Sequence, residues 1–192
     1  FAAQLQQANI VPLLSTGNAS GVPYYTMPYV EGESLRARLA GGRLPLDDAI
    51  HILGDVARAL SYAHAHGVVH RDIKPDNVLL SHGAAVVTDF GIAKAIVDAR
   101  TETRHEALTQ TGVSVGTPAY MAPEQASGDK AVDHRSDLYA FGCLAFELLT
   151  GEPPFQGRSL QQALVAHLIE EPPRVDERRP EIPAGLADLV AW

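Results

Sequence analysis

Residues 68–80 of this 192-residue chain read VVHRDIKPDNVLL, and they constrain its fold more than any other stretch. Two apolar runs, Val68-Val69 and Val78-Leu79-Leu80, enclose a series of charged and amide side chains. Apolar flanks of this kind predict short strands that enter the core, so the polar residues between them are expected to be held in fixed positions. A fixed polar loop lowers stability, and this one therefore indicates a function.

Apolar periodicity predicts helices on both sides of this loop. The strongest pattern covers residues 46–67, with acids in the first turn and Gly67 just past the end. Its apolar side chains recur at three- and four-residue steps: Ile50, Leu53, Val56, Ala57, Leu60 and Ala63. Further helices are predicted at 137–150, where Gly151 and two prolines follow, at 159–171 and at 185–192.

Strands are predicted in two places. Residues 10–30 favour a hairpin in which IVPLL and VPYYTMPYV flank the turn-rich stretch STGNASG. A short strand pair is expected around AAVVTDFG. The polar stretch 98–116 has too few apolar residues to pack by itself, so we expect it to be ordered only under some conditions.

Composition limits the classes of function. A chain that is 46% hydrophobic can bury one core, and a net charge of -8 argues against nucleic-acid binding. Cys143 is the single cysteine and cannot form an intrachain disulfide, which fits a reducing, cytosolic setting. No apolar run reaches the length of a membrane span, and Phe1 is not followed by the pattern of a signal peptide.

The loop carries the groups needed for phosphoryl transfer. The carboxylate of Asp72 can accept a proton from a hydroxyl, and the ammonium of Lys74 can lie against phosphate oxygens. The amide oxygen of Asn77 is a hard ligand suited to Mg²⁺. Asp89 follows in VTDFG, where Gly91 allows a sharp turn, so Asp89 could share a metal ion with Asn77.

Three motifs, HRDIKPDN, DFG and GTPAYMAPE, resemble in sequence and order the signature of protein kinases. Lys74 and the GTPAY stretch are similar to serine/threonine kinases, here of the bacterial, Hanks type. The resemblance implies an α+β, protein-kinase-like fold that consists mostly of the helical C-terminal lobe. Residues 1–29 would be a remnant of the N-terminal lobe with the gatekeeper, and residues 30–192 the hinge and the C-terminal lobe, ending within a helix.

The same resemblance implies the cofactors ATP and Mg²⁺ and assigns their ligands. Asp72 looks like the catalytic base, Lys74 like the phosphate-contacting lysine, and Asn77 and Asp89 like the magnesium ligands. The stretch YYTMPYVEGESL resembles the hinge. The residues expected around the adenine are the gatekeeper Met27, the backbone of Pro28 and Val30, and the underlying Leu79.

Further residues have structural roles in the family that this chain resembles. His70 and Phe90 would pack in an internal hydrophobic spine, and Asp137 would accept hydrogen bonds from the backbone of the catalytic loop. Glu124 normally pairs with an arginine that lies beyond Trp192 in the family pattern, so we expect Glu124 to be unpaired.

Regulation is also implied by the resemblance. Arg71, beside the catalytic aspartate, would belong to a positive cluster that a phosphate on the 98–116 stretch neutralises. Thr109 and Thr111 resemble the paired phosphothreonines of bacterial serine/threonine kinases. Thr117 resembles instead the threonine that hydrogen-bonds the catalytic aspartate and lysine.

The chain departs from the family pattern at its start. It contains no glycine-rich loop and no lysine–glutamate pair of the ATP-binding lobe, so we expect these 192 residues alone to transfer phosphate poorly. The expected partners are proteins with Ser or Thr hydroxyls and a second kinase copy for trans-autophosphorylation. The kinase domain is expected in the cytoplasm, and a membrane anchor elsewhere in the parent protein would be compatible with this.

Two other functions remain open at this stage. A non-catalytic, partner-binding module is one alternative, although Asp72, Asn77 and Asp89 are all intact. A small-molecule phosphotransferase is the other, and the threonine-bearing segment that closes in APE argues against it. A zinc site at His64 and His66 is disfavoured, because both lie at a predicted helix end.

Overall fold

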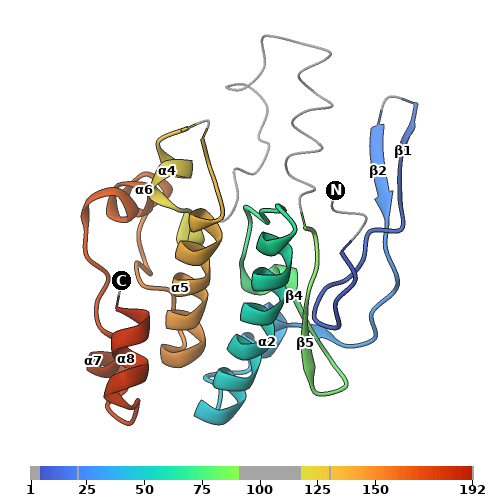
Figure 1. Cartoon of the computed structure of the whole chain (residues 1–192). Coiled ribbons are helices and arrows are strands. Elements are labelled where there is room, and N and C mark those ends of the chain that lie inside the picture. The colour runs from blue at the N-terminus through green and yellow to red at the C-terminus, as the bar shows by residue number, and fades with distance from the viewer. Residues whose placement is uncertain (1–4, 21, 91–117, 130, 192) are drawn as a thin grey trace.

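The computed structural model describes residues 5–20, 22–90, 118–129 and 131–191. Figure 1 shows α2 and α5 side by side, with the strands on one side of α2 and α6, α7 and α8 beyond α5. The described elements, in chain order, are β1 (Ser15–Ala19), β2 (Val22–Thr26), β3 (Glu33–Ser34), α1 (Leu35–Ala40), α2 (Leu46–Ala65), the 3-10 helix η2 (Pro75–Asn77), β4 (Val78–Ser81), β5 (Ala84–Val87), the 3-10 helix η3 (Pro118–Tyr120), α4 (Pro123–Ala126), α5 (Arg135–Thr150), α6 (Leu160–Ile169), α7 (Val175–Arg178) and α8 (Ala184–Val190).

The predicted hairpin within residues 10–30 is present, but its first strand was wrongly placed. β1 and β2 pair antiparallel from Ser15↔Thr26 to Ala19↔Val22, so part of the expected turn STGNASG is strand. Residues 10–14 are not strand, and Ile10 instead forms a parallel bridge with Val87. Cross-strand pairing with residues 22–26 outweighs the local turn preference of the Ser, Gly and Asn residues.

A second, three-stranded sheet has the order β3-β4-β5. β4 and β5 form the strand pair expected around AAVV, joined at His82 (φ 49°) and Gly83 (φ 82°). Two successive residues with positive φ are typical of tight hairpin turns. β3 lies close against this pair, since a Cβ added at Gly32 would be 2.0 Å from the carbonyl oxygen of Leu80.

The predicted helix at 46–67 is confirmed as α2, and its core-facing side differs slightly from the expected one. Leu53, Val56 and their helical neighbours are buried, whereas Ile50 is 44% exposed and Ala57 is exposed. Both lie one position after a buried residue, so they fall on the flank of the apolar stripe. The stripe packs against β5 and α5.

A buried carboxylate joins α2 to the sheet. Asp55 accepts a hydrogen bond from the backbone N–H of Ala85 at 2.7 Å, and Arg58 also donates to it. From the other side, the Asn9 amide donates to the Ala85 carbonyl at 2.8 Å. The position of β5, which leads into VTDFG, is therefore fixed from two sides.

The predicted helix at 137–150 is confirmed as α5, which begins two residues earlier, at Arg135. Its end follows the sequence, because Gly151 adopts a left-handed φ of 95° and donates to the Glu147 carbonyl. The Arg179 guanidinium donates to the carbonyls of Leu149 and Leu44, each at 3.1 Å. α5 is mostly buried and forms the centre of the helical half.

The two last predicted helices are confirmed: α6 is shorter than predicted at both ends, and α8 begins one residue earlier and ends at Val190. Ser159 caps α6 by accepting from the N–H of Gln162, and the Gln162 side chain accepts from the N–H of Ser159.

Cys143 is buried in α5, and burial raises the pKa of its thiol to about 12. None of the helices that the structure describes is long and apolar enough to cross a membrane.

Candidate active site

The candidate catalytic loop begins where α2 ends. Gly67 has a left-handed φ of 72°, which glycine adopts without the strain that a side chain would bring. The next residue, Val68, is buried, and its N–H donates to the Ala63 carbonyl at 2.9 Å. The apolar flank predicted at Val68 therefore enters the core, and the polar loop follows directly.

One buried carboxylate holds the first turn of this loop. Asp137, fully buried near the start of α5, accepts from the backbone N–H of His70 at 2.8 Å and from that of Arg71 at 2.6 Å. Arg71 has a positive φ of 72°, which is uncommon for a residue with a side chain. The two hydrogen bonds hold the backbone in this conformation, and its strain is of order 1 kcal/mol.

His64 completes the environment of Asp137 and was not foreseen from the sequence. Its Nε2 lies 2.8 Å from Asp137 Oδ2, the oxygen that also accepts from His70. His66 bonds through Nδ1 to the Tyr62 carbonyl at 2.7 Å. In the described part of the chain, no group of three or more His, Cys, Asp or Glu side chains could hold a metal ion.

His70 connects the loop to the segment after β5. Its Nδ1 accepts from the N–H of Asp72 at 3.2 Å, so Nε2 carries the proton and donates to the Thr88 carbonyl at 2.8 Å. Burial lowers the pKa of His70, which favours this neutral form. The Phe90 ring packs edge-on against the imidazole at a centroid distance of 4.6 Å.

Asp72, Lys74 and Asn77 come together at the surface end of the loop. Lys74 Nζ lies 2.7 Å from Asp72 Oδ2, and the Asn77 Nδ2 donates to the same oxygen at 3.1 Å and to the Asp72 carbonyl at 2.8 Å. No described residue donates a hydrogen bond to Asp72 Oδ1, and the Asp72 side chain is 34% exposed. One carboxylate oxygen is thus fixed while the other is available to a ligand.

Asp89 lies two residues after the end of β5. The N–H of Thr88 donates to the Asn77 carbonyl at 3.0 Å, which brings Asp89 next to the loop. Asp89 itself has a left-handed φ of 66°. Its Oδ1 accepts from the Tyr25 hydroxyl at 2.8 Å and from Thr88 Oγ1 at 3.4 Å. Burial and the Asp89 carboxylate raise the pKa of Tyr25 to about 12.

The donor atoms at this place fit a magnesium ion. Asn77 uses its Nδ2 toward Asp72, so its amide oxygen remains for a ligand, and Asp89 keeps Oδ2. Both are the hard oxygen donors that Mg²⁺ prefers, and Mg²⁺ commonly takes only one or two protein ligands, with waters and phosphates completing its shell.

The residues expected around an adenine come from the connection between β2 and β3 and from β4. Met27 directly follows β2, and its sulfur accepts from Thr88 Oγ1 at 3.3 Å. Pro28 and Val30 are half-buried in the connection to β3, and Leu79 is half-buried opposite Ser34 in the β3–β4 pair. A small pocket beside Met27 is lined by residues 10–13, Tyr25, Met27, Asp89 and Phe90, and Pro28, Val30 and Leu79 do not line it.

A network around the buried Glu147, with the half-buried Arg36 as its cation, was not predicted either. The Arg36 guanidinium donates to Glu147 at 2.7 Å and to the Tyr120 hydroxyl at 2.6 Å, and Tyr120 in turn donates to Glu147. Burial and the Glu147 carboxylate raise the pKa of Tyr120. Glu147 is the only charged residue in the apolar run 138–149, and this was the signal in the sequence for a buried partner.

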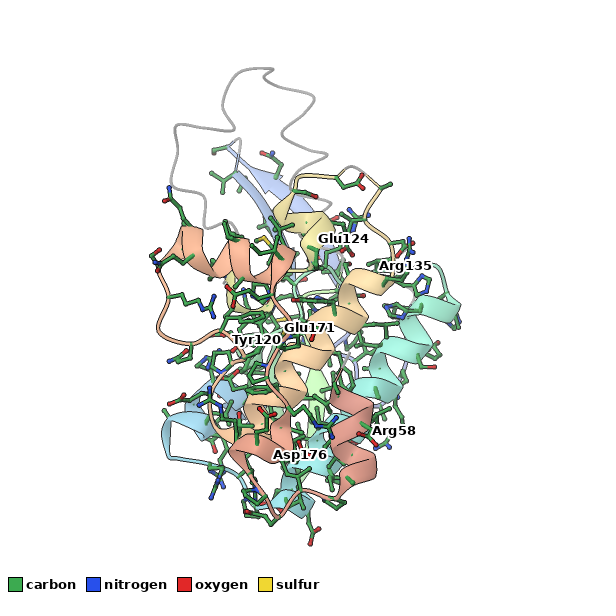
Figure 2. The ribbon with its side chains drawn as sticks, turned by 90° about the vertical axis from the view of Figure 1, so that its left-hand side faces the viewer. Arg58, Tyr120, Glu124, Arg135, Glu171 and Asp176 are labelled. Atoms are coloured by element: carbon green, nitrogen blue, oxygen red, sulfur yellow. The ribbon has the colours of Figure 1, made fainter. Side chains whose placement is uncertain are left out.

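Residues that follow the Gly-Thr-Pro sequence at 116–118 also lie against the candidate catalytic loop. Gln125 donates to the Arg71 carbonyl at 2.8 Å, and the Arg71 guanidinium donates to the Val132 carbonyl at 3.3 Å. Glu124 makes no ion pair with any residue in the described ranges; Figure 2 shows it on α4, with Arg135 at the start of α5. Thr109, Thr111 and Thr117 lie outside the described residues.

The comparisons with known proteins agree with this geometry. A family model, the protein kinase domain, matches residues 1–191. The serine/threonine-protein kinase PknB of Mycobacterium leprae is 42% identical over 195 residues, which cover 98% of this chain and 30% of PknB. PknD of Mycobacterium tuberculosis is 40% identical over 193 residues, which cover 99% of this chain and 28% of PknD. This chain thus spans less than a third of the length of either relative.

A solved structure supports the same assignment. The crystal structure of the kinase domain of PknI from Mycobacterium tuberculosis, in a mutant form, matches with a TM-score of 0.74 at 29% identity. The match covers 99% of this chain and 64% of that one. The α+β protein-kinase fold expected from HRDIKPDN, DFG and GTPAYMAPE is thereby confirmed, and the chain belongs to the protein kinase domain family.

Proposed function

We propose that the protein containing this chain is a serine/threonine kinase that transfers the γ-phosphoryl group of ATP to Ser and Thr hydroxyls of proteins. The observation that carries the proposal is the arrangement around Asp72. Its Oδ2 is held by Lys74 and Asn77, and no described residue donates to Oδ1. A base in this state needs little reorganisation when a substrate hydroxyl arrives.

In the proposed reaction, Asp72 Oδ1 accepts the proton of the substrate hydroxyl. The hydroxyl oxygen forms a bond to the γ-phosphorus while the bond to the leaving oxygen of ADP breaks. Lys74, 2.7 Å from Asp72, orients the carboxylate and offers its remaining N–H groups to a phosphate oxygen. Because Lys74 is hydrogen-bonded to the proposed base Asp72, we expect this pair of residues to position both the substrate hydroxyl and the phosphate.

Asn77 and Asp89 would hold Mg²⁺ through their free oxygens. The ion would neutralise charge on the phosphate oxygens during transfer. The backbone of Pro28 and Val30 would hold the adenine, with Met27 as gatekeeper and Leu79 beneath the ring. In this arrangement residues 1–29 belong to the nucleotide-covering lobe and residues 30–192 to the hinge and the helical lobe.

Regulation by phosphorylation is part of the proposal. Arg71 lies next to Asp72, and a phosphate on Thr109 or Thr111 would be a partner for its guanidinium. Among the described residues, that guanidinium makes a single, long hydrogen bond of 3.3 Å to the Val132 carbonyl, which a phosphate could replace. We expect one kinase copy to phosphorylate the other, and Thr117 to bond the catalytic aspartate and lysine.

The test uses the product of the complete gene, because these 192 residues contain neither a glycine-rich loop nor its lysine–glutamate pair. The protein is incubated with Mg²⁺ and labelled ATP, together with a mixed protein substrate and small hydroxylated acceptors. We expect label on Ser and Thr of protein, including Thr109 or Thr111, and no label when EDTA removes the metal. Label on the small acceptors alone, or no label from a folded protein, would contradict the proposal.

A further inference from the structure

We propose that the Tyr25 hydroxyl is a positioning group that orients the Asp89 carboxylate toward its metal ion. This inference rests on the proposed function, because it takes Asp89 as a magnesium ligand. Tyr25 does not touch the ion or the substrate in this proposal. It acts through Asp89 alone.

The contact itself has the geometry that such a role requires. The Tyr25 hydroxyl donates to Asp89 Oδ1 at 2.8 Å, and Thr88 Oγ1 lies 3.4 Å from the same oxygen. No residue in the described ranges donates to Oδ2. Because Tyr25 donates to Oδ1, the other carboxylate oxygen faces away from this donor and remains free for a cation. Hydrogen bonds to a ligating carboxylate commonly fix its orientation and tune its affinity for the metal.

The hairpin turns Tyr25 inward while its neighbours face solvent. On β2, Val22 is 65% and Tyr24 is 50% exposed, whereas Tyr25 is half-buried in the pocket that also contains Met27 and Phe90. Successive residues of a strand point to opposite faces, so the inward position is set by the β1–β2 register. An apolar side chain could fill this pocket, and only the hydroxyl adds a bond to Asp89.

The backbone of Asp89 already has other supports, but these do not set its side-chain torsions. Hydrogen bonds from the Thr88 N–H to the Asn77 carbonyl and from His70 to the Thr88 carbonyl hold the two peptide groups before Asp89. The left-handed φ of Asp89 fixes where its Cβ points. Tyr25 then selects which carboxylate oxygen faces the protein, across a separation of 64 residues in the chain.

The test compares Tyr25→Phe with Tyr24→Phe in the full gene product. Both lose one hydroxyl from the same strand, but only the first loses the bond to Asp89. Mn²⁺ affinity is measured by electron paramagnetic resonance in the presence of a non-hydrolysable ATP analogue. We expect Tyr25→Phe to weaken Mn²⁺ binding by about 10- to 100-fold. Tyr24→Phe should bind as the wild type does. Nucleotide affinity measured in EDTA should be equal in all three proteins.

The remaining outcomes separate this inference from the function on which it rests. Loss of Mn²⁺ binding in Asp89→Asn, together with wild-type binding in Tyr25→Phe, would overturn the inference and leave the metal role of Asp89 intact. Tighter binding in Tyr25→Phe would also overturn it, because the hydroxyl would then compete with the ion. Absence of Mn²⁺ binding in the wild type would overturn both. If Tyr25→Phe does not fold, Tyr25→Met, which also lacks the hydroxyl, must show the same loss.

Discussion

The candidate catalytic loop and the β1–β2 hairpin flank the same candidate nucleotide site, but they are held in different ways. The loop is fixed by fully or almost fully buried groups, among them Asp137, His70 and Asn77. The hairpin is mostly exposed and is held by its own ladder, by the exposed pair Ser15 and Thr26, and by the hydrogen bond from Tyr25 to Asp89. The chemical groups are thus supported by the helical core, whereas the hairpin is expected to open more easily.

Of the substitutions considered, a replacement of Asp137 should lower the free energy of unfolding most, because Asp137 supports the candidate catalytic loop. In Asp137→Asn, the new NH₂ group replaces either Oδ2, where it faces the His70 amide and His64, or Oδ1, where it faces the Arg71 amide. Unmet buried donors cost about 1–3 kcal/mol each, so we expect the free energy of unfolding to fall by about 3 kcal/mol in a urea titration. Asp133→Asn, an exposed change just before the same helix, is the matched control. Equal stability of the two variants would contradict the role assigned to Asp137.

The second largest loss of stability is expected when the hydrogen-bond network of Arg36, Tyr120 and Glu147 is broken. Arg36→Met leaves Glu147 buried without its cation, which we expect to destabilise the fold by about 2–3 kcal/mol. Arg38→Met on the same helix is the control and should change stability by less than about 0.5 kcal/mol. The double variant Arg36→Met with Glu147→Gln should recover part of the loss, because the uncompensated charge is gone. If the two single losses simply add, Arg36 and Glu147 are not coupled as described.

The buried histidines predict a dependence of stability on pH. Burial lowers the pKa of both His70 and His167, whereas histidines of the unfolded chain titrate near about 6.5. The unfolded state then binds more protons in mildly acidic solution. Their contribution is therefore complete above that pH and is lost as the pH falls below it.

Each histidine can add at most about 1.4 kcal/mol per pH unit to this slope. Chemical unfolding at pH 7.5, 6.5 and 5.5 measures it, and His167→Gln should reduce it. A slope that is unchanged in this variant would mean that His167 does not titrate differently in the folded and unfolded states.

The smallest effect is expected in the hairpin. The Ser15 and Thr26 hydroxyls lie 2.6 Å apart on an exposed surface, and such cross-strand pairs contribute about 0.2–1 kcal/mol. Ser15→Ala should therefore leave global unfolding unchanged within error. It should increase amide exchange only in 15–26. A global loss comparable to that of Asp137→Asn would remove the distinction between the two regions.

The sequence predicted the parts of this fold that local patterns determine. α2 and α5 follow from apolar periodicity and from the glycines at their ends. The wrongly placed strand at 10–14 shows the limit of such patterns. Ile10 forms a bridge with Val87, which is far along the chain, and local propensity does not predict pairing between distant residues.

The candidate site also has a part that the sequence predicted and a part that it did not. The side chains of HRDIKPDN lie close together because they are close in sequence, and the structure brings Asp72, Lys74 and Asn77 into one cluster. Their supports come from distant segments, as with Tyr25 and Asp89 or Arg36 and Glu147, which are 111 residues apart. No spacing rule predicts such pairs, although a lone charge in an apolar run indicates that one exists.

The most direct test of the account concerns Asp72 Oδ1, the proposed proton acceptor in the candidate catalytic loop. Asp72→Asn removes the proposed base, whereas Asp76→Asn makes the same exchange four residues later, at an exposed position that pairs with Arg36 at 3.4 Å. The rate of phosphate transfer to a protein substrate is measured at saturating Mg²⁺ and ATP, with folding checked by circular dichroism. The account predicts a loss of about 10²- to 10⁴-fold in Asp72→Asn and little change in Asp76→Asn. Equal rates in the two folded variants would contradict it.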